Sequence, residues 1–64
     1  MEMTADLHHK HRVITKLGKP VRIHKKLKGV VIKTLPEYRY KVSVSNSGVN
    51  WVETLHINEI EEWI

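Results

Sequence analysis

The chain has 64 residues, a formal net charge of +4 and no cysteine. A domain this short buries only about 60% of its unfolded surface, and a pocket of enzyme size would consume much of its core, so we expect neither an enzyme nor a bound cofactor. The missing cysteines exclude a disulfide framework and a thiolate metal site, and the positive charge favours anionic partners.

Residues 1–18 carry two competing patterns. Thr4 can cap a helix that Gly18 would end, and apolar residues between them fall near one helical face. The β-branched run over 12–16 is equally typical of a strand. We expect a short helix or an arm at 1–18, ahead of a small β-barrel at 19–64. The acidic start has no apolar h-region and no apolar run approaches a membrane span, so we expect a cytoplasmic protein without membrane contact.

From Val21 onward the sequence alternates as β-strands do. We expect strands at 21–26, 29–34, 38–45, 49–55 and 60–63, and a single helical turn at 56–59. Bends are expected at Lys28-Gly29, at 35–37, and at 46–48, where Asn46 or Gly48 can adopt a positive φ. Tyr40 should face inward together with Val42. The residues expected in the core are Ile23, Val30, Ile32, Val42, Val44 and Ile60.

Five short strands with a one-turn helix before the last describe an all-β, SH3-like barrel, and two segments resemble SH3-like families. The opening Val21-Arg22-Ile23, followed by Gly29-Val30-Val31, is similar to the V-R-I … G-x-V start of those families. The ending at 55–63 resembles their terminal signature, in which an apolar pair brackets the turn and an acidic residue precedes the last strand. The resemblance covers residues 19–63. It implies architecture more than function, since the patterns recur in nucleic-acid-binding KOW and Tudor-like modules and in the ferredoxin-docking small subunit of photosystem I.

The same patterns recur in the plasmid-borne type II dihydrofolate reductases, which build a pore from a Val-Gln-Ile-Tyr strand. The matching stretch of this chain is Val52-Glu53-Thr54-Leu55. Glu53 and Leu55 stand where that family has glutamine and tyrosine, so the resemblance does not carry over the cofactor contacts. We therefore reject that activity for this chain.

Positive charge is concentrated between Lys10 and Lys41, which enclose every lysine and arginine, whereas the C-terminal end is acidic. Such polarity is typical of a module that presents one face to a polyanion. We predict nucleic-acid contacts, mainly to phosphates and with weak sequence preference, from Arg22, His24, Lys25, Lys26, Lys28, Lys33, Arg39 and Lys41. Tyr38 and Trp51 are candidate stacking residues beside these cations.

Two alternatives stay open. The chain can be an adaptor or a phage-type modulator that docks on an acidic protein, or its lysines can be a solvated exterior that discourages edge aggregation. His8, His9 and His11 form a close run, but the spacing gives no fixed tetrahedral geometry, so we expect an arm that gains charge at low pH rather than a metal site. The sequence does not determine whether the ligand is DNA or RNA, nor the oligomeric state.

Overall fold

The computed structural model describes residues 10–63, and within them the chain is almost entirely β-structure. Residues 10–14 form a helical turn. The elements that follow are β1 (Pro20–Ile23), β2 (Leu27–Leu35), β3 (Arg39–Asn46), β4 (Val49–His56), the 3-10 turn η1 (Ile57–Glu59) and β5 (Ile60–Glu62). The sequence therefore predicted the number of strands, their succession along the chain and the single helical turn before the last strand. The strand boundaries differ from the predicted ones by up to three residues.

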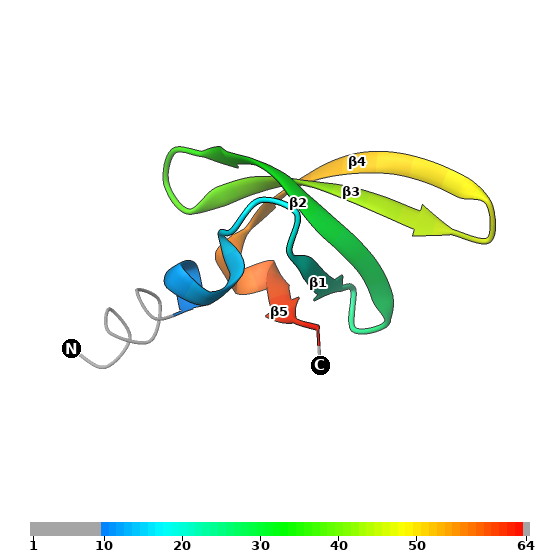
Figure 1. Cartoon of the computed structure of the whole chain (residues 1–64), viewed down its shortest axis with the longest axis horizontal. Coiled ribbons are helices and arrows are strands. Elements are labelled where there is room, and N and C mark those ends of the chain that lie inside the picture. Colours follow the sequence, from blue (N-terminus) through cyan, green and yellow to red (C-terminus); the bar gives the residue numbers. More distant parts are fainter. Residues whose placement is uncertain (1–9, 64) are drawn as a thin grey trace.

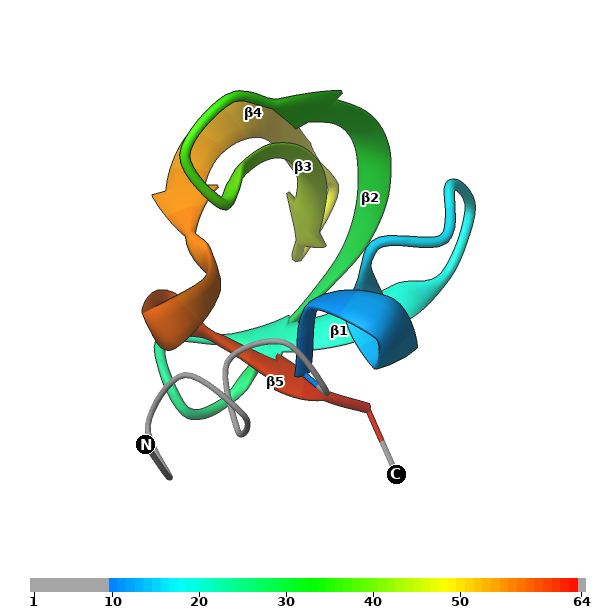
Figure 2. The same cartoon turned by 90° about the vertical axis from the view of Figure 1, so that its left-hand side faces the viewer.

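All five strands belong to one antiparallel sheet with the order β4-β3-β2-β1-β5. The long strands β2, β3 and β4 arch over β1 and β5, so that the sheet curls strongly about its inner face (Figures 1 and 2). The two outermost strands, β4 and β5, do not pair with each other. The strand pairing therefore forms an open, curled sheet and does not close into the expected barrel.

The core lies on the inner face of this curl. Val21 and Ile23 of β1, and Tyr40, Val42 and Val44 of β3, are fully enclosed. The other buried members of this cluster are Ile14, Val31, Leu55, Ile57 and Ile60. The period of two in β3 is therefore confirmed, with Tyr40 and Val42 pointing inward and Arg39 and Lys41 pointing outward.

The expected facing of β2 is wrong. Val31 is fully buried, Val30 is only half-buried, and Ile32 is 46% exposed. The ladder shows why, because Val31 lies opposite Val42 while Lys33 lies opposite Lys41, so Ile32 is an extra residue in a β-bulge. Both Ile32 and Lys33 consequently face outward.

The first bend also lies elsewhere than expected. The chain turns at residues 24–26, where His24 and Lys25 have φ angles of 51° and 68°, and Lys26 N–H donates to the Ile23 carbonyl at 3.2 Å. Gly29 instead lies within β2, where an added Cβ would clash with Val42 Cγ1. This glycine serves close strand packing rather than a turn. In the β3–β4 hairpin the positive φ angles belong to Ser47 and Gly48.

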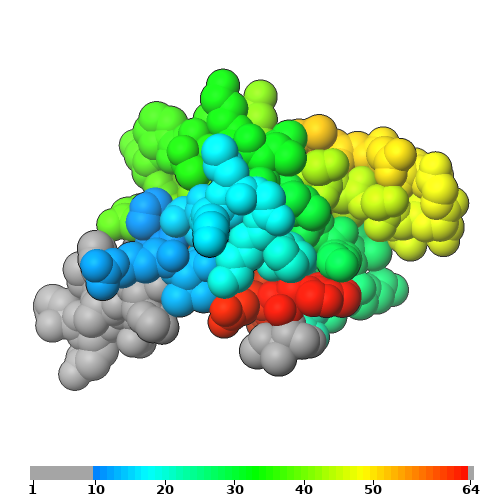
Figure 3. All heavy atoms as spheres, in the orientation of Figure 1, coloured from blue at the N-terminus to red at the C-terminus, as the bar shows by residue number. Residues whose placement is uncertain are grey.

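The described part of the N-terminal segment is attached to the sheet. Ile14 is buried in the core, and the Tyr40 hydroxyl hydrogen-bonds to Nδ1 of His11. Gly18 N–H donates to the Val31 carbonyl at 2.8 Å, and Val31 N–H donates to the Lys19 carbonyl at 3.2 Å. Figure 3 shows this segment filling the space between β2 and β5. Of the short helix or arm expected at 1–18, residues 10–14 are helical, and residues 1–9 lie outside the described part of the chain.

Candidate nucleic-acid interface

The predicted cations fall into two groups at opposite ends of β2. We call Lys25, Lys26 and Lys28 the turn cluster, because they lie in or next to the β1–β2 turn. Lys33, Arg39 and Lys41, on the outer face of β2 and β3, form the strand cluster. All six are exposed. Lys28 and Lys33 are five residues apart on one strand, which separates the two clusters by about 17 Å.

The remaining two predicted ligands, Arg22 and His24, already have acidic neighbours. Arg22 Nε lies 3.4 Å from Glu61 Oε1 on the adjacent strand, so the two side chains form an ion pair, although this nitrogen makes no hydrogen bond within residues 10–63. Arg22 also lies directly opposite Lys28 on β2, so the turn cluster borders an ion pair. The Lys28 ammonium is 5.7 Å from the centre of the Trp63 ring, within range of a cation–π contact.

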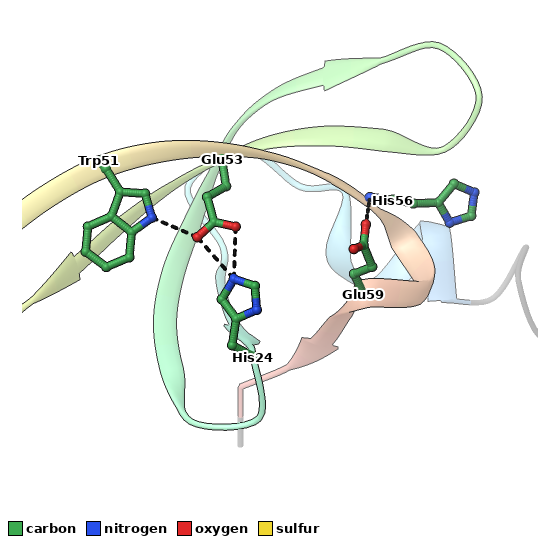
Figure 4. Close-up of polar contacts among 5 residues, drawn as sticks. All are labelled: His24, Trp51, Glu53, His56 and Glu59. Atoms are coloured by element: carbon green, nitrogen blue, oxygen red, sulfur yellow. Dashed lines mark hydrogen bonds and ion pairs between the residues drawn. The ribbon is translucent and has the colours of Figure 1, made fainter.

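A carboxylate joins the β1–β2 turn to β4 (Figure 4). Glu53 accepts a hydrogen bond from Trp51 Nε1 at 2.7 Å, and His24 Nε2–H donates to its two oxygens at 2.9 and 3.1 Å. The pKa of Glu53 lies below its ordinary value, first because of the hydrogen bond from Trp51 and then because of His24, although partial burial opposes both. This arrangement fixes the turn that carries Lys25 and Lys26 against the sheet.

Trp51 is consequently placed away from the strand cluster. Its ring is half-buried on the inner face, where its Cα partner is the buried Val44. Arg39 and Lys41 point to the outer face of the same hairpin. Trp51 is thus hydrogen-bonded to Glu53, on the side of His24, and does not lie beside Arg39 and Lys41, the cations with which the sequence grouped it.

Tyr38, by contrast, adjoins the strand cluster. It precedes Arg39 in the β2–β3 turn and is 37% exposed, with a φ of 59°. Its ring lies edge-on to the His11 ring, with 5.1 Å between the two ring centroids. The centroid of the His56 ring, at the end of β4, lies 6.5 Å from that of Tyr38. These rings place aromatic surface next to Arg39, which is the combination that stacks with unpaired bases.

Within the strand cluster, Lys33 and Lys41 lie directly opposite each other across β2 and β3. Thr54 is the next residue in that row, on β4, so within the described residues 10–63 no carboxylate flanks the two ammonium groups in this row. Arg39 has an acidic neighbour, Glu37, at 3.4 Å, but both side chains are more than half exposed and such pairs contribute little. Like charges placed directly opposite destabilise a sheet.

Sequence reasoning missed the role of Glu53 and the bulge at Ile32. A glutamate two residues after a tryptophan on one strand places both side chains on the same face, and this spacing was a usable signal. The bulge left no signal, because Val30, Val31 and Ile32 are all apolar and β-branched and show no alternation.

Two further features concern ligands. A cavity of about 210 Å³ lies between the β1–β2 turn, η1 and β5. Cations and carboxylates both line it: Arg22, His24, Lys25, Asn58, Glu59 and Glu61. Its mixed charge favours neither sign of ligand. Within residues 10–63 there is no group of three or more histidine and carboxylate side chains arranged to hold a metal ion, and no helix with the length and apolar character to cross a membrane.

When the chain was compared with known proteins, no protein-family model, no curated protein and no solved structure matched it.

Proposed function

We propose that this protein is a small basic module that binds nucleic acid with weak sequence preference. The strand cluster, with Tyr38 beside it, is the primary contact. The turn cluster is a second contact on the same strand, with Arg22 and His24 as its neighbours. The observation that carries the proposal is the direct opposition of Lys33 and Lys41 without a flanking carboxylate.

That arrangement is costly in the unbound protein. Opposed like charges disfavour the folded sheet by about 0.2–1 kcal/mol, and a bound phosphate removes this cost while making two charge-assisted contacts. The lysines lie on paired strands, which hold them in place before the ligand arrives. Lysine contacts to phosphate carry no base information, and this supports weak sequence preference.

We further propose that the curled sheet is an SH3-like domain. The strand order β4-β3-β2-β1-β5 and the 3-10 turn between the last two strands support this architecture. The sequence similarity at 21–31 and 55–63 points the same way. In this fold the outer face of β2 and β3 is a broad, ordered platform, which suits contact with a backbone rather than insertion into a groove.

The test compares two triple variants of equal charge. One carries Lys33→Gln, Arg39→Gln and Lys41→Gln, and the other carries Lys25→Gln, Lys26→Gln and Lys28→Gln. Affinity for one duplex and one single-stranded oligonucleotide is measured by fluorescence anisotropy over a range of salt concentrations. The strand-cluster variant should lower the magnitude of the log K against log salt slope by about 2–3 on duplex DNA, and equally for unrelated sequences.

The turn-cluster variant should produce the smaller change, because Lys28 has Trp63 as a neighbour and the turn lies beside Glu61. Each variant serves as the control for the other, since both remove three positive charges. Equal losses would mean that net charge alone attracts the ligand. No binding by the unmodified chain at low salt would exclude the function.

A second candidate function has one observation in its favour. Ile32 is 46% exposed and Val30 is half-exposed on the same outer face as Lys33. An apolar patch rimmed by cations suits an acidic protein partner as well as a nucleic acid. Ile32→Ser distinguishes the two, because it should weaken an acidic protein complex strongly and leave phosphate contacts unchanged.

A further inference from the structure

The open edge of β4 has features that the nucleic-acid proposal does not use. β4 is eight residues long and, among residues 10–63, pairs with no strand besides β3, so one side of its backbone is unpaired in this sheet. The β3–β4 hairpin projects beyond the rest of the molecule (Figure 1). A long unpaired strand of this kind is a template for pairing with another strand.

The backbone pattern shows which groups face outward. Ile57 N–H donates to the Tyr38 carbonyl at 2.8 Å, and the β3–β4 register runs without interruption from that end to Asn46–Val49. Antiparallel ladders alternate between bonded and non-bonded pairs, so the odd-numbered residues of β4 bond to β3 and the even-numbered ones point to the open side. These are Asn50, Val52, Thr54 and His56.

One of these four outward groups is already occupied. The His56 N–H donates to Glu59 Oε1 at 2.8 Å, as part of the cap of η1. Among residues 10–63, no residue accepts a hydrogen bond from the N–H groups of Asn50, Val52 or Thr54. Three successive outward positions are therefore available to a partner strand.

The side chains of β4 lack the usual protection of an edge. Edge strands are commonly blocked by lysine or proline. This chain has eleven lysines and arginines, yet none lies on β4, and no proline does either. Its one charged residue, Glu53, is held by Trp51 and His24. Val52 meanwhile is 54% exposed on the outer face.

We propose that two copies of this chain pair antiparallel along β4, with Val52 at the two-fold axis, and form a continuous ten-stranded sheet. In this register Val52 meets Val52 of the second copy, and Asn50 meets Thr54, so an apolar residue faces an apolar one and an amide faces a hydroxyl. The outward N–H groups of all three residues fall on the bonded pairs. On the inner face Trp51 lies opposite Glu53 of the second copy.

A second copy fits this edge better than an unrelated peptide. The residues match themselves about Val52 without any positively charged side chain at the contact, although each chain carries a formal net charge of +4. A domain of this size also has a small core of its own, and strand pairing between copies is a common way to stabilise such domains. The pairing leaves the strand cluster exposed, so it does not depend on the proposed function.

The test is sedimentation equilibrium of the full chain in the hundred-micromolar range, with Val52→Lys and Val52→Glu as variants. Each substitution opposes like charges at the two-fold axis and should weaken dimerisation by about tenfold or more. An equimolar mixture of the two should recover the dimer, because lysine then meets glutamate. Ser45→Lys is the control, since it adds the same charge as Val52→Lys on the outer face of β3, a strand that lies inside the sheet between β2 and β4.

A second readout needs no variant. Amide hydrogen exchange at Asn50, Val52 and Thr54 should slow as the chain concentration rises, whereas Trp51 and Glu53, bonded to β3, should show no such dependence. A monomer at all concentrations overturns the proposal, even if an extended peptide then binds the edge. A dimer that both Val52 variants preserve, or a mixture that stays monomeric, overturns the Val52-centred pairing.

Discussion

Two rows of the sheet place cations directly opposite each other, and they differ in what lies beside them. The first row crosses β2, β1 and β5 and reads Lys28, Arg22, Glu61. The second crosses β2, β3 and β4 and reads Lys33, Lys41, Thr54. In the first row a glutamate compensates the repulsion within the protein itself. In the second row no carboxylate among residues 10–63 compensates it. Under our proposal, the first row uses its charges within the fold and the second row uses them to bind an external anion.

Substitutions at the buried positions of β2 have the largest expected effect on stability. They also test which side chains of β2 face inward, on which the description of the two rows depends. Val31→Ala should lower the free energy of unfolding by about 2–3 kcal/mol, because it leaves a cavity in a fully buried site. Ile32→Ala should change it by only about 0.5 kcal/mol or less, since that side chain is at the surface of the bulge. Urea unfolding of both variants measures the difference. Equal costs would place Ile32 in the core and remove Lys33 from the outer face.

The next effect concerns Glu53, which holds the β1–β2 turn, next to the first row, against β4. Its pKa is lowered in the folded state, so the folded chain binds fewer protons there than the unfolded chain. The contribution of Glu53 to stability is therefore complete above the ordinary glutamate pKa of about 4.3 and is lost as the pH falls below it.

Glu53→Gln should accordingly lower the free energy of unfolding by about 1 kcal/mol near neutral pH. The difference between the two proteins should shrink as the pH falls through the acid range. Chemical denaturation at several pH values tests this, with Glu37→Gln as the control, because Glu37 lies in an exposed turn. A difference that stays constant down to strongly acidic pH would show that the charge of Glu53 is irrelevant to the fold.

The smallest expected change in stability tests the difference between the two rows most directly. Lys41→Gln removes one of two opposed charges and should raise the free energy of unfolding by about 0.2–1 kcal/mol at low salt, with the gain fading as salt screens the repulsion. Lys28→Gln should show no gain, because Glu61 lies in its row and Trp63 lies beside its ammonium group. Matching gains from both substitutions would abolish the distinction between the rows.

These positions also show how much of the molecule the sequence could predict. The succession of strands along the chain, the helical turn and the alternation in β3 were predicted from the pattern of apolar and turn residues, and Ile23, Val42, Val44 and Ile60 are buried as expected. The facing of β2 could not be derived, because three β-branched residues in a row fit either face.

Gly29 illustrates a different limit. A glycine usually marks a turn, but this one lies in a strand because Val42 leaves no room for a Cβ. The actual turn uses His24 and Lys25 in left-handed conformations, which histidine adopts more readily than most residues but lysine does not. The candidate site was predictable as a set of cations. Its division into two clusters depends on contacts with Glu53 and Glu61 that only the folded chain brings together.

We propose that the second row, with Lys33 and Lys41, is the ligand site. An NMR titration tests this proposal most directly. A short oligonucleotide is added to isotope-labelled protein, and the shifts of backbone amides are followed. The account predicts that the earliest and largest shifts occur at Lys33, Tyr38, Arg39 and Lys41, and that Arg22 and Glu61 shift little. Shifts spread evenly over all exposed lysines, or centred on the first row, would contradict it.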